Sequence, residues 1–386
     1  MAKNIFENEL ESANQVSIYV LTGGPVAGKS SLELPLLETL LCRNYDVVWI
    51  KESATEIITS GVKPFNGITT PLNFQKILFK MQYFKEELYR TMERVSDRKL
   101  IIICDRGLCD AKAYMTDEEW KTILKEEGIT DLEILARYRA IIHMVTAANG
   151  AEEAFEKKRA ENPARSKDET RDVAIALDEK IKEAYLGHGE IYYVGNETDF
   201  EGKKQKALRV FLSCLGEPVP SQHQEKIVVK KPSEEYLLQK KAQKRSIVQI
   251  YLKSNGKEER RIRMMGDGNS FVYYLTRKGV GNYSDYQEKS ISKDVYDALM
   301  LEMDTERKPI VKTRWYFSEN DTYYNMDVYP NWKNYAVIEI RGSKENVNIE
   351  LPSGIEEVRN VTDDIRFSNY AFSKYFLSEE EVNKLV

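Results

Sequence analysis

The first half of the chain alternates short apolar runs with longer stretches in which apolar residues recur every three or four positions. The short runs are typical of buried strands, and the longer stretches are typical of helices that cover a sheet. The runs predict strands at Val16–Leu21, Asp46–Ile50, Leu100–Cys104, Ala140–Val145 and Ile191–Val194. Strands separated by helices form βαβ units with right-handed crossovers. We therefore predict an α/β domain with a parallel sheet over residues 16–216, after an N-terminal tail at 1–15.

The pattern changes beyond residues 217–224, which contain two prolines and read as a linker. Apolar and polar residues then alternate with period two in closely spaced runs, which is typical of an antiparallel sheet or barrel. The runs are Ser246–Lys253, Glu259–Met265, Phe271–Lys278, Ile310–Phe317, Tyr323–Val328 and Tyr335–Arg341. We expect a second, mainly β domain over residues 225–386.

Composition and charge exclude several classes of protein. The 386 residues are 42% hydrophobic and 31% charged, as in ordinary folded proteins, and the net charge of -5 gives no general attraction to nucleic acid. No run approaches the roughly 20 apolar residues of a membrane helix, and the polar N-terminus does not resemble a secretory signal. Four cysteines without a CxxC pair and three histidines do not favour a zinc site. We expect a cytoplasmic protein without a nucleic-acid partner.

The clearest chemical motif follows the first predicted strand and opens a predicted helix, where it fits GxxxxGK[ST]. Its residues are Gly23, Gly24, Pro25, Val26, Ala27, Gly28, Lys29, Ser30 and Ser31. Glycines let backbone N–H groups converge on phosphate oxygens, Lys29 reaches the β- and γ-phosphates, and the Ser30 hydroxyl binds Mg²⁺. This loop predicts binding of ATP or GTP with Mg²⁺. A chance Gly-rich turn is the alternative.

Two carboxylates follow predicted strands and are candidates for the same site. Asp105 takes the position of a Walker-B carboxylate that holds Mg²⁺ with Ser30, although a capping role also explains it. Glu52 is placed to orient a hydroxyl acceptor or water at the carboxyl edge of the sheet, or it is simply an exposed residue at a helix start. Glu56 is a weaker candidate for that role. Arg106 either touches a phosphate or pairs with Asp110.

The charged segment 157–171 contains Arg159, Arg165 and Arg171 around Asn162-Pro163. An arginine-bearing lid that closes over phosphates would supply positive charge to the transition state and exclude water. A solvated charged loop would have the same composition. We favour the lid, with Arg159 and Arg165 as catalytic residues beside Lys29, Glu52 and Asp105.

These features resemble the P-loop kinase-like ATPase family that includes ribosylnicotinamide-kinase-type and deoxynucleoside-kinase-type domains. The likeness rests on GGPVAGKSS, ESATE, CDRG and ENPARSKDETR within residues 15–215. It implies phosphoryl transfer or hydrolysis of a nucleoside triphosphate, and it does not select the acceptor.

Basic residues of the second domain recur at strand spacing, each two positions from another polar or charged residue, so that the two share one face of the strand. The pairs are Arg261 and Arg263, Thr276 and Lys278, Lys312 and Arg314, and Glu339 and Arg341. Facing inward in a small barrel, they would form a cationic lumen for a polyphosphate or a phosphorylated head group. Facing outward, they would be ordinary solvated charges.

The order of these pieces resembles the CYTH family, the triphosphate tunnel fold of adenylyl cyclase and thiamine triphosphatase types. Matching pieces between residues 225 and 376 are VQIYL, RRIRM, YYLTRKG, YQEKSIS, IVKTRWYF, NMDVY, AVIEIR and VTDDIRFSNYAFS. The resemblance implies that Arg261, Arg263, Lys278, Lys312 and Arg314 bind phosphate. It implies metal-side carboxylates at Glu288 and Glu339, with Asp327 as a further candidate.

The chain departs from the CYTH pattern where the family carries acidic residues. The ExExK strand is replaced by Glu225–Lys230, EKIVVK, and a late ExE pair by Glu339-x-Arg341. Fewer carboxylates mean fewer Mg²⁺ ligands, so the pattern favours anion binding over triphosphate hydrolysis.

The pairing of the two domains resembles the translocation defect protein family, which implies nucleotide binding in the first domain and lipid head-group recognition in the second. The leading hypothesis is a Mg²⁺-dependent NTPase or small-molecule kinase whose second domain binds a phosphorylated ligand. One alternative is a nucleotide-controlled binding protein that contacts membranes peripherally through phosphoinositide or phosphatidic acid head groups. Another is a triphosphatase that acts in the second domain.

Overall fold

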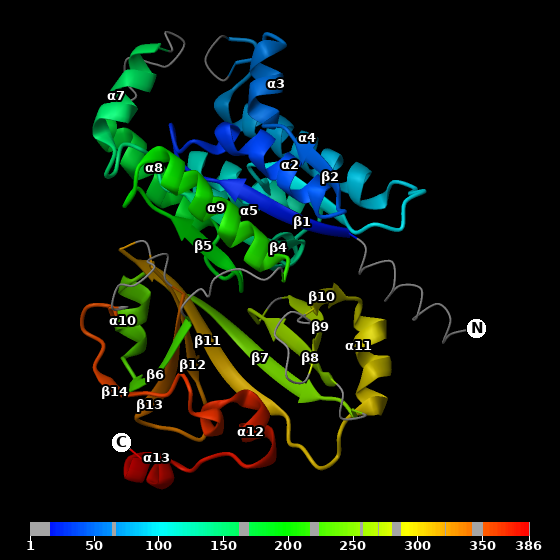
Figure 1. Cartoon of the computed structure of the whole chain (residues 1–386), viewed down its shortest axis with the longest axis vertical. Coiled ribbons are helices and arrows are strands. Elements are labelled where there is room, and N and C mark those ends of the chain that lie inside the picture. The colour runs from blue at the N-terminus through cyan, green and yellow to red at the C-terminus, as the bar shows by residue number, and fades with distance from the viewer. Residues whose placement is uncertain are drawn as a thin grey trace. The chain divides into compact units, whose positions relative to one another are not determined.

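The computed structural model describes residues 16–63, 67–161, 170–216, 224–254, 258–268, 270–279, 287–320, 322–341 and 350–385. The predicted tail, nearly all of the predicted linker and Arg165 lie outside these ranges. The chain divides into two compact units, each with its own sheet (Figure 1). The first comprises Met1–Tyr185 and Glu190–Phe211, and the second comprises Leu186–Gly189 and Leu212–Val386.

The first unit is built on a parallel five-stranded sheet in the order β2-β3-β1-β4-β5. The strands are β1 (Val16–Thr22), β2 (Asp46–Ile50), β3 (Leu100–Asp105), β4 (Tyr138–Met144) and β5 (Ile191–Val194). All five strands were expected from the apolar runs, and their bounds differ from the prediction by two residues at most. The central strands are almost wholly buried, which explains their continuous apolar sequences.

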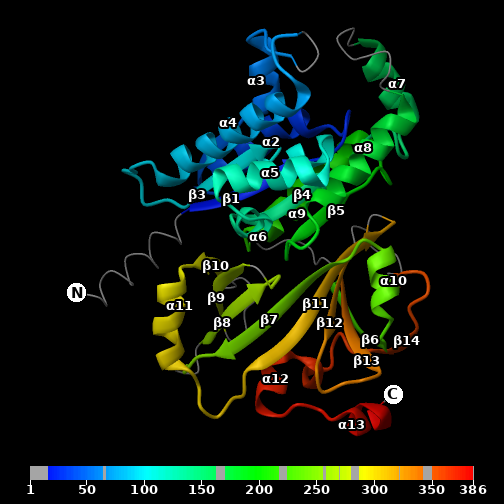
Figure 2. The same ribbon diagram turned by 180° about the vertical axis from the view of Figure 1, so that it is seen from behind.

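Helices cover both faces of this sheet (Figures 1 and 2). They are η1 (Lys29–Leu32), α2 (Glu33–Cys42), α3 (Ser53–Thr59), α4 (Pro71–Thr91), η2 (Leu108–Tyr114), α5 (Asp117–Glu127), α6 (Asp131–Ala136), α7 (Glu152–Glu161), α8 (Arg171–Ala184) and α9 (Phe200–Cys214). On one face, Phe211 of α9 packs against Tyr19 of β1, with ring centroids 4.8 Å apart. On the other, Phe79 of α4 packs against Trp120 of α5 at 5.7 Å.

The second unit is built on a nine-stranded antiparallel sheet in the order β10-β9-β8-β7-β11-β12-β13-β6-β14. The strands are β6 (Gln224–Lys230), β7 (Gln243–Tyr251), β8 (Glu258–Gly266), β9 (Phe271–Gly279), β10 (Gln287–Ile291), β11 (Ile310–Glu319), β12 (Thr322–Val328), β13 (Tyr335–Arg341) and β14 (Glu357–Asn360). Its short helices are α10 (Glu234–Gln239), α11 (Lys293–Leu299), η4 (Met300–Glu302), η5 (Ile365–Phe367), α12 (Asn369–Lys374) and α13 (Glu379–Leu385). The fold class predicted from the sequence is confirmed: a parallel sheet flanked by helices, then a separate antiparallel sheet.

The two faces of the second sheet differ in chemistry because its residues alternate between them. One face is apolar: Trp315, Phe317, Met326 and Ile338 pack there with Leu237 of α10. The residues between these positions, including Arg314, Asp327 and Glu339, form the opposite face. Within the described strands, β10 and β14 are the two edges of the sheet and are not paired with each other.

None of the helices in the described part of the chain is both long enough and apolar enough to cross a membrane.

Candidate functional site

The candidate nucleotide site lies at the carboxyl edge of the parallel sheet. The phosphate loop begins where the central strand β1 ends, and Asp105 is the last residue of the neighbouring strand β3. Glu52 follows β2 and is the N-terminal cap of α3. The strand order changes direction at β1, and such a switch point is where open α/β sheets bind ligands. The topology therefore brings three sequence-predicted residues, Lys29, Glu52 and Asp105, to one edge.

The phosphate loop has a compact conformation that requires glycine at two positions. Gly23 has φ 143°, and a Cβ atom there would lie 2.0 Å from the carbonyl oxygen of Met144. Gly28 has φ 93° and caps the following turn, where a Cβ atom would meet the Phe200 ring at 2.6 Å. Ser30 and Ser31 are exposed in that turn, so the hydroxyl of Ser30 is accessible to a ligand.

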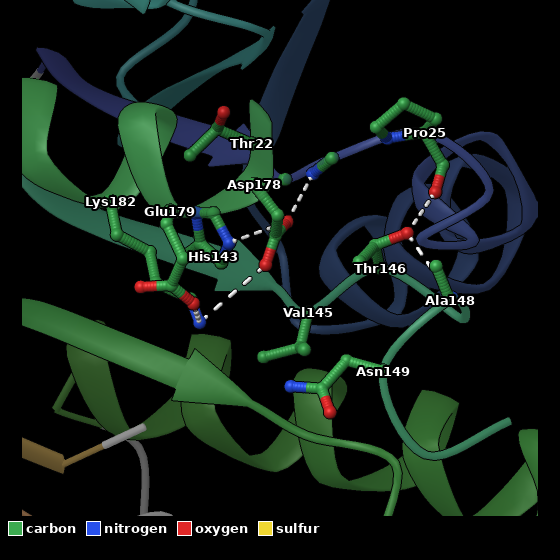
Figure 3. Close-up of polar contacts among 12 residues, drawn as sticks. Thr22, Pro25, His143, Val145, Thr146, Ala148, Asn149, Asp178, Glu179 and Lys182 are labelled. Atoms are coloured by element: carbon green, nitrogen blue, oxygen red, sulfur yellow. Dashed lines mark hydrogen bonds and ion pairs between the residues drawn. The ribbon is translucent and has the colours of Figure 1, made fainter. Parts of the chain in front are cut away.

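Neighbouring elements hold the rest of the loop in place (Figure 3). The N–H of Gly24 donates to Asp178 Oδ1 at 2.6 Å, and the Thr146 hydroxyl donates to the carbonyl of Pro25. Val26 adopts a positive φ of 56°, and the side chain of Ala27 is buried. Contacts from β4, the segment after it and α8 thus fix the shape of the loop.

Lys29 lies among several charged groups and is partly buried. Its ammonium donates to the carbonyl of Gly23 at 3.1 Å. Burial, together with the positive charge of Arg106, lowers the pKa of Lys29 to about 8, although Asp105 and Glu52 oppose this shift. An anion bound at the loop would favour the charged ammonium, which is what a phosphate-binding lysine requires.

The surroundings of Asp105 suit a carboxylate that binds a cation. Burial, with the nearby charges of Glu52 and Asp110, raises the pKa of Asp105 to about 6, although Lys29 opposes the shift. Its Oδ1 atom is buried and has no hydrogen-bond partner among the described residues. Such a carboxylate oxygen, at the same sheet edge as the loop that carries the exposed hydroxyl of Ser30, fits Mg²⁺, an ion that takes few protein ligands and completes its shell with phosphate and water. The described residues contain no cluster of three His, Cys, Asp or Glu side chains that could hold a metal unaided.

Arg106 joins the two other acidic groups of this edge. It pairs with Glu52 at 2.5 Å and with Asp110 at 2.9 Å. Burial by itself would raise the pKa of Glu52, but Arg106, the hydroxyl of Thr55 and the charge of Lys29 together outweigh burial, so the net shift of the pKa is downward. Glu52 is therefore ionised and able to accept a proton or orient water. The pair with Asp110 was one of two roles expected for Arg106, whereas Glu56 pairs with Lys85.

The lid remains a prediction because Arg165 and the centre of the segment lie outside the described residues. Arg159 lies on α7 and pairs with Glu156 at 2.7 Å. Arg171, the first residue of α8, donates to the carbonyl of Ala148 at 2.8 Å.

A buried group behind the loop was missed from the sequence (Figure 3). Asp178 of α8 lies 3.0 Å from His143 Nε2 and 3.5 Å from the Lys182 ammonium, besides accepting from Gly24. Burial would raise the pKa of Asp178, but His143, Lys182 and the Gly24 N–H outweigh it and hold the pKa at about 2. The one available signal was a histidine inside the apolar run AIIHMV. No local pattern marks Asp178.

In the second unit, strand register places the predicted phosphate-binding residues on one face. Arg261 and Arg263 lie opposite Thr276 and Tyr274 of β9, and Arg314 lies opposite Asp327 of β12. Lys312 precedes Arg314 by two residues, and half-buried Lys278 follows Thr276 by two, so both share this face. The side chain of Arg341 lies outside the described part of the structure.

The same face also carries the three candidate metal-side carboxylates, and each contacts a cation. Asp327 accepts from Lys312 at 2.6 Å and from Arg314 at 2.6 and 2.7 Å. Glu339 lies 3.4 Å from Arg314. Glu288 accepts from Arg263 at 2.8 Å and from the hydroxyl of Thr276 at 2.9 Å. A donor set already engaged by cations does not fit a divalent metal ion.

Register also shows which residue of the altered ExExK strand faces these charges. Lys226 lies opposite Glu339, and its ammonium is 3.4 Å from Glu339 Oε1. Glu225 is adjacent in sequence and belongs to the other face. The residue of this strand that lies on the charged face is therefore the cation Lys226. The one acid that remains in the strand, Glu225, lies on the other face.

The first domain matches a known family of sequences. The model of a family described as an AAA domain matches residues 18–203. Residues 18–203 therefore resemble an AAA-type P-loop domain. Together with the loop geometry, this match supports a nucleotide-binding enzyme in general terms. No curated protein matches the chain.

Solved structures resemble parts of the chain at low identity. An inorganic triphosphatase is 21% identical, with a TM-score of 0.30, over 40% of this chain and 96% of that one. Deoxyadenosine kinase from M. mycoides is 15% identical, with a TM-score of 0.36, over 51% of this chain and 98% of that one.

Proposed function

We propose that this chain is a Mg²⁺-dependent P-loop enzyme that binds ATP or GTP and acts as an NTPase or small-molecule kinase. The observation that carries the proposal is the arrangement of Lys29, Glu52 and Asp105 at the carboxyl edge of β1–β3, with a buried oxygen on Asp105 that has no hydrogen-bond partner in the described part of the chain. This arrangement supports a site for the phosphates of a nucleotide together with Mg²⁺.

Each residue has a distinct role in this proposal. The loop amides and Lys29 bind the phosphate oxygens, while Ser30 and Asp105 hold Mg²⁺, which neutralises charge on the transferred phosphoryl group. Glu52 orients the attacking hydroxyl or water and can accept its proton. Arg159 and Arg165 supply positive charge when their segment closes over the site.

For the second domain we propose binding of a phosphorylated small molecule or lipid head group, rather than triphosphate hydrolysis. The ion-paired state of Asp327, Glu339 and Glu288 supports binding, because no carboxylate among them is free for a catalytic metal. The translocation defect family and nucleotide-controlled membrane contact belong to this proposal as well, and they rest on the pairing of domains alone.

Nucleotide binding and turnover by the full chain test the first-domain proposal. We expect ATP or GTP to bind with Mg²⁺ and to release phosphate or phosphorylate an added nucleoside. Lys29→Ala removes a charge-assisted contact worth about 1.5–3 kcal/mol, and so should weaken binding by roughly 10- to 100-fold. Lys121→Ala is the matched control, because Lys121 is exposed on α5 and pairs with Glu118. Full affinity in the Lys29→Ala protein would refute the proposal.

A further inference from the structure

Asn325 carries a polar side chain in a fully buried position. It is 0% exposed, and neither its Nδ2 nor its Oδ1 atom has a hydrogen-bond partner among the described residues. A buried amide left in this state costs about 1–3 kcal/mol. It lies on β12 two residues before Asp327 and between Tyr316 of β11 and Glu339 of β13, so it belongs to the charged face. A buried amide of this kind indicates that a ligand with hydrogen-bonding groups binds there.

Arg245 provides a second, independent sign on the neighbouring strands. It lies opposite Arg314 in the pairing of β7 with β11 and is 6% exposed. One of its guanidinium nitrogens donates to the carbonyl of Lys244, while its Nε has no hydrogen-bond partner in the described ranges. Two arginines placed opposite each other in a buried position favour an anion between or beside them.

The charged face of the second sheet carries more cations than carboxylates among its described residues. The cations that register places there are Lys226, Arg245, Arg261, Arg263, Lys278, Lys312 and Arg314, against the carboxylates Glu259, Glu288, Asp327 and Glu339. Among the described residues of this face the cations outnumber the carboxylates, so the face would attract an anion. Guanidinium and ammonium groups are the side chains that bind phosphoryl oxygens most strongly.

The carboxylates of this face already contact other groups, so a metal ion would have to compete for them. Both oxygens of Asp327, of Glu339 and of Glu288 contact an ammonium, a guanidinium or a hydroxyl group. A divalent ion would have to displace Lys226 or Arg314, and thus exchange a covalently attached cation for a dissolved one. Lys226 supplies beside Glu339 the positive charge that a metal would otherwise bring.

We propose that this face is a phosphoryl-anion site built around Asn325, and that it binds its ligand without a divalent metal ion. The inference rests on the phosphorylated-ligand part of the proposed function and assigns its chemistry. The ligand is a compact di- or triphosphate, free or carried on a larger molecule. Asn325 Nδ2 donates to one phosphoryl oxygen, while its Oδ1 accepts from a protonated one. Arg245, Lys312 and Arg314 supply the positive charge.

Binding of inorganic tripolyphosphate to the full-length Lys29→Ala protein tests this site, because that background weakens the phosphate loop. Calorimetry in EDTA and in MgCl₂ compares the two metal conditions. We expect binding in EDTA at least as tight as in MgCl₂, since Mg²⁺ neutralises the ligand. Binding that requires Mg²⁺ would overturn the inference and leave anion binding by the second domain intact. Binding in neither buffer would refute both the metal-free inference and anion binding by the second domain. The proposal for the first domain is tested separately, by nucleotide binding to the unmodified chain.

Asn325→Leu in the same background separates a binding role from a structural one. Replacing an unpartnered buried amide by an apolar group of similar size should raise the melting temperature of the ligand-free protein and weaken tripolyphosphate binding at least 10-fold. Asn334→Leu is the control, because Asn334 is exposed in the same unit. Unchanged affinity in the Asn325→Leu protein would remove Asn325 from the site.

A second variant keeps the test decisive where Asn325→Leu does not fold. Lys226→Glu places two carboxylates side by side at a partly exposed position. We expect it to lose binding in EDTA and to recover part of it in MgCl₂, because the ion then replaces the missing ammonium. Undiminished binding in EDTA would show that Lys226 does not take the place of a metal, and would overturn the metal-free assignment.

Discussion

At the scale of single residues, Asp105 shows the energetic cost of keeping a charged group buried in the nucleotide site. Its pKa of about 6 exceeds the ordinary value of 3.8 because the carboxyl group is buried near other acids. The folded protein therefore holds a proton between about pH 4 and pH 6 that the unfolded chain has released. By linkage, stability falls as the pH rises through this window, so the ionised carboxylate destabilises the fold at pH 7.

Asp105→Asn should therefore stabilise the ligand-free protein while it impairs the site. A difference of about 2 pKa units corresponds to about 3 kcal/mol as an upper limit, so we expect a gain of about 1–3 kcal/mol at pH 7. The gain should vanish below about pH 3, where the carboxyl group is neutral in both the folded and the unfolded chain. Urea unfolding at the two pH values measures it, and Mg-nucleotide affinity should fall in the same variant. Exposed Asp97→Asn should change neither quantity. Equal stability of the Asp105→Asn and parent proteins at pH 7 would contradict the assigned cost.

At the scale of elements, the junction between β1 and the phosphate loop depends on the carbonyl of Met144 in β4. Gly23→Ala would bring a Cβ atom to 2.0 Å from that oxygen, and strand backbone cannot move aside easily. Gly61→Ala is the matched control, because Gly61 has φ 98° and no described residue beyond its two sequence neighbours lies within 4 Å of the added carbon. The left-handed conformation alone costs roughly 1–2 kcal/mol in the control.

We expect Gly23→Ala to cost more than Gly61→Ala in the free energy of unfolding, and to abolish nucleotide binding that Gly61→Ala preserves. Chemical denaturation and nucleotide titration of the two proteins measure the difference. Equal losses in the two variants would mean that β4 does not constrain the loop.

The elements could be predicted from sequence wherever burial imposes a pattern on them. Strands β1 to β5 lie between helices, so their apolar runs are continuous, and in β7 less buried and buried positions alternate from Lys244 to Gln249. Strands β10 and β14 were missed because they are short edge strands, QEKSI and EVRN, which bury too little to require alternation.

The candidate site could be predicted only where its residues are close in sequence. The phosphate loop is one contiguous motif, and Asp105 and Glu52 directly follow strands. Asp178 contacts Gly24 across 154 positions, so its role depends on how α8 packs and leaves no local trace. In the second unit, alternation placed Lys312 and Arg314 on one face. Only strand register showed that Lys226, rather than Glu225, faces Glu339.

At the scale of the whole molecule, the two proposed sites belong to units with separate sheets, so each ligand should protect its own unit. A ligand present at 100 times its Kd stabilises the unit that binds it by about 2.7 kcal/mol, which slows exchange of the most protected amide hydrogens by roughly 100-fold. Hydrogen exchange followed peptide by peptide distinguishes the units. We expect Mg-ATP or Mg-GTP to slow exchange in β1, β3 and β4, and tripolyphosphate in EDTA to slow it in β11, β12 and β13.

The variants make this pattern decisive because each should remove only one of the two effects. Lys29→Ala should strongly reduce the protection by nucleotide and keep the protection by tripolyphosphate, whereas Asn325→Leu should strongly reduce the protection by tripolyphosphate and keep the protection by nucleotide. Protection of both sheets by either ligand alone would contradict this expectation, since it would mean that occupation of one site is transmitted to the other unit. Protection of β11–β13 by nucleotide that persists in the Lys29→Ala protein would instead place the triphosphate tail on the charged face of the second sheet.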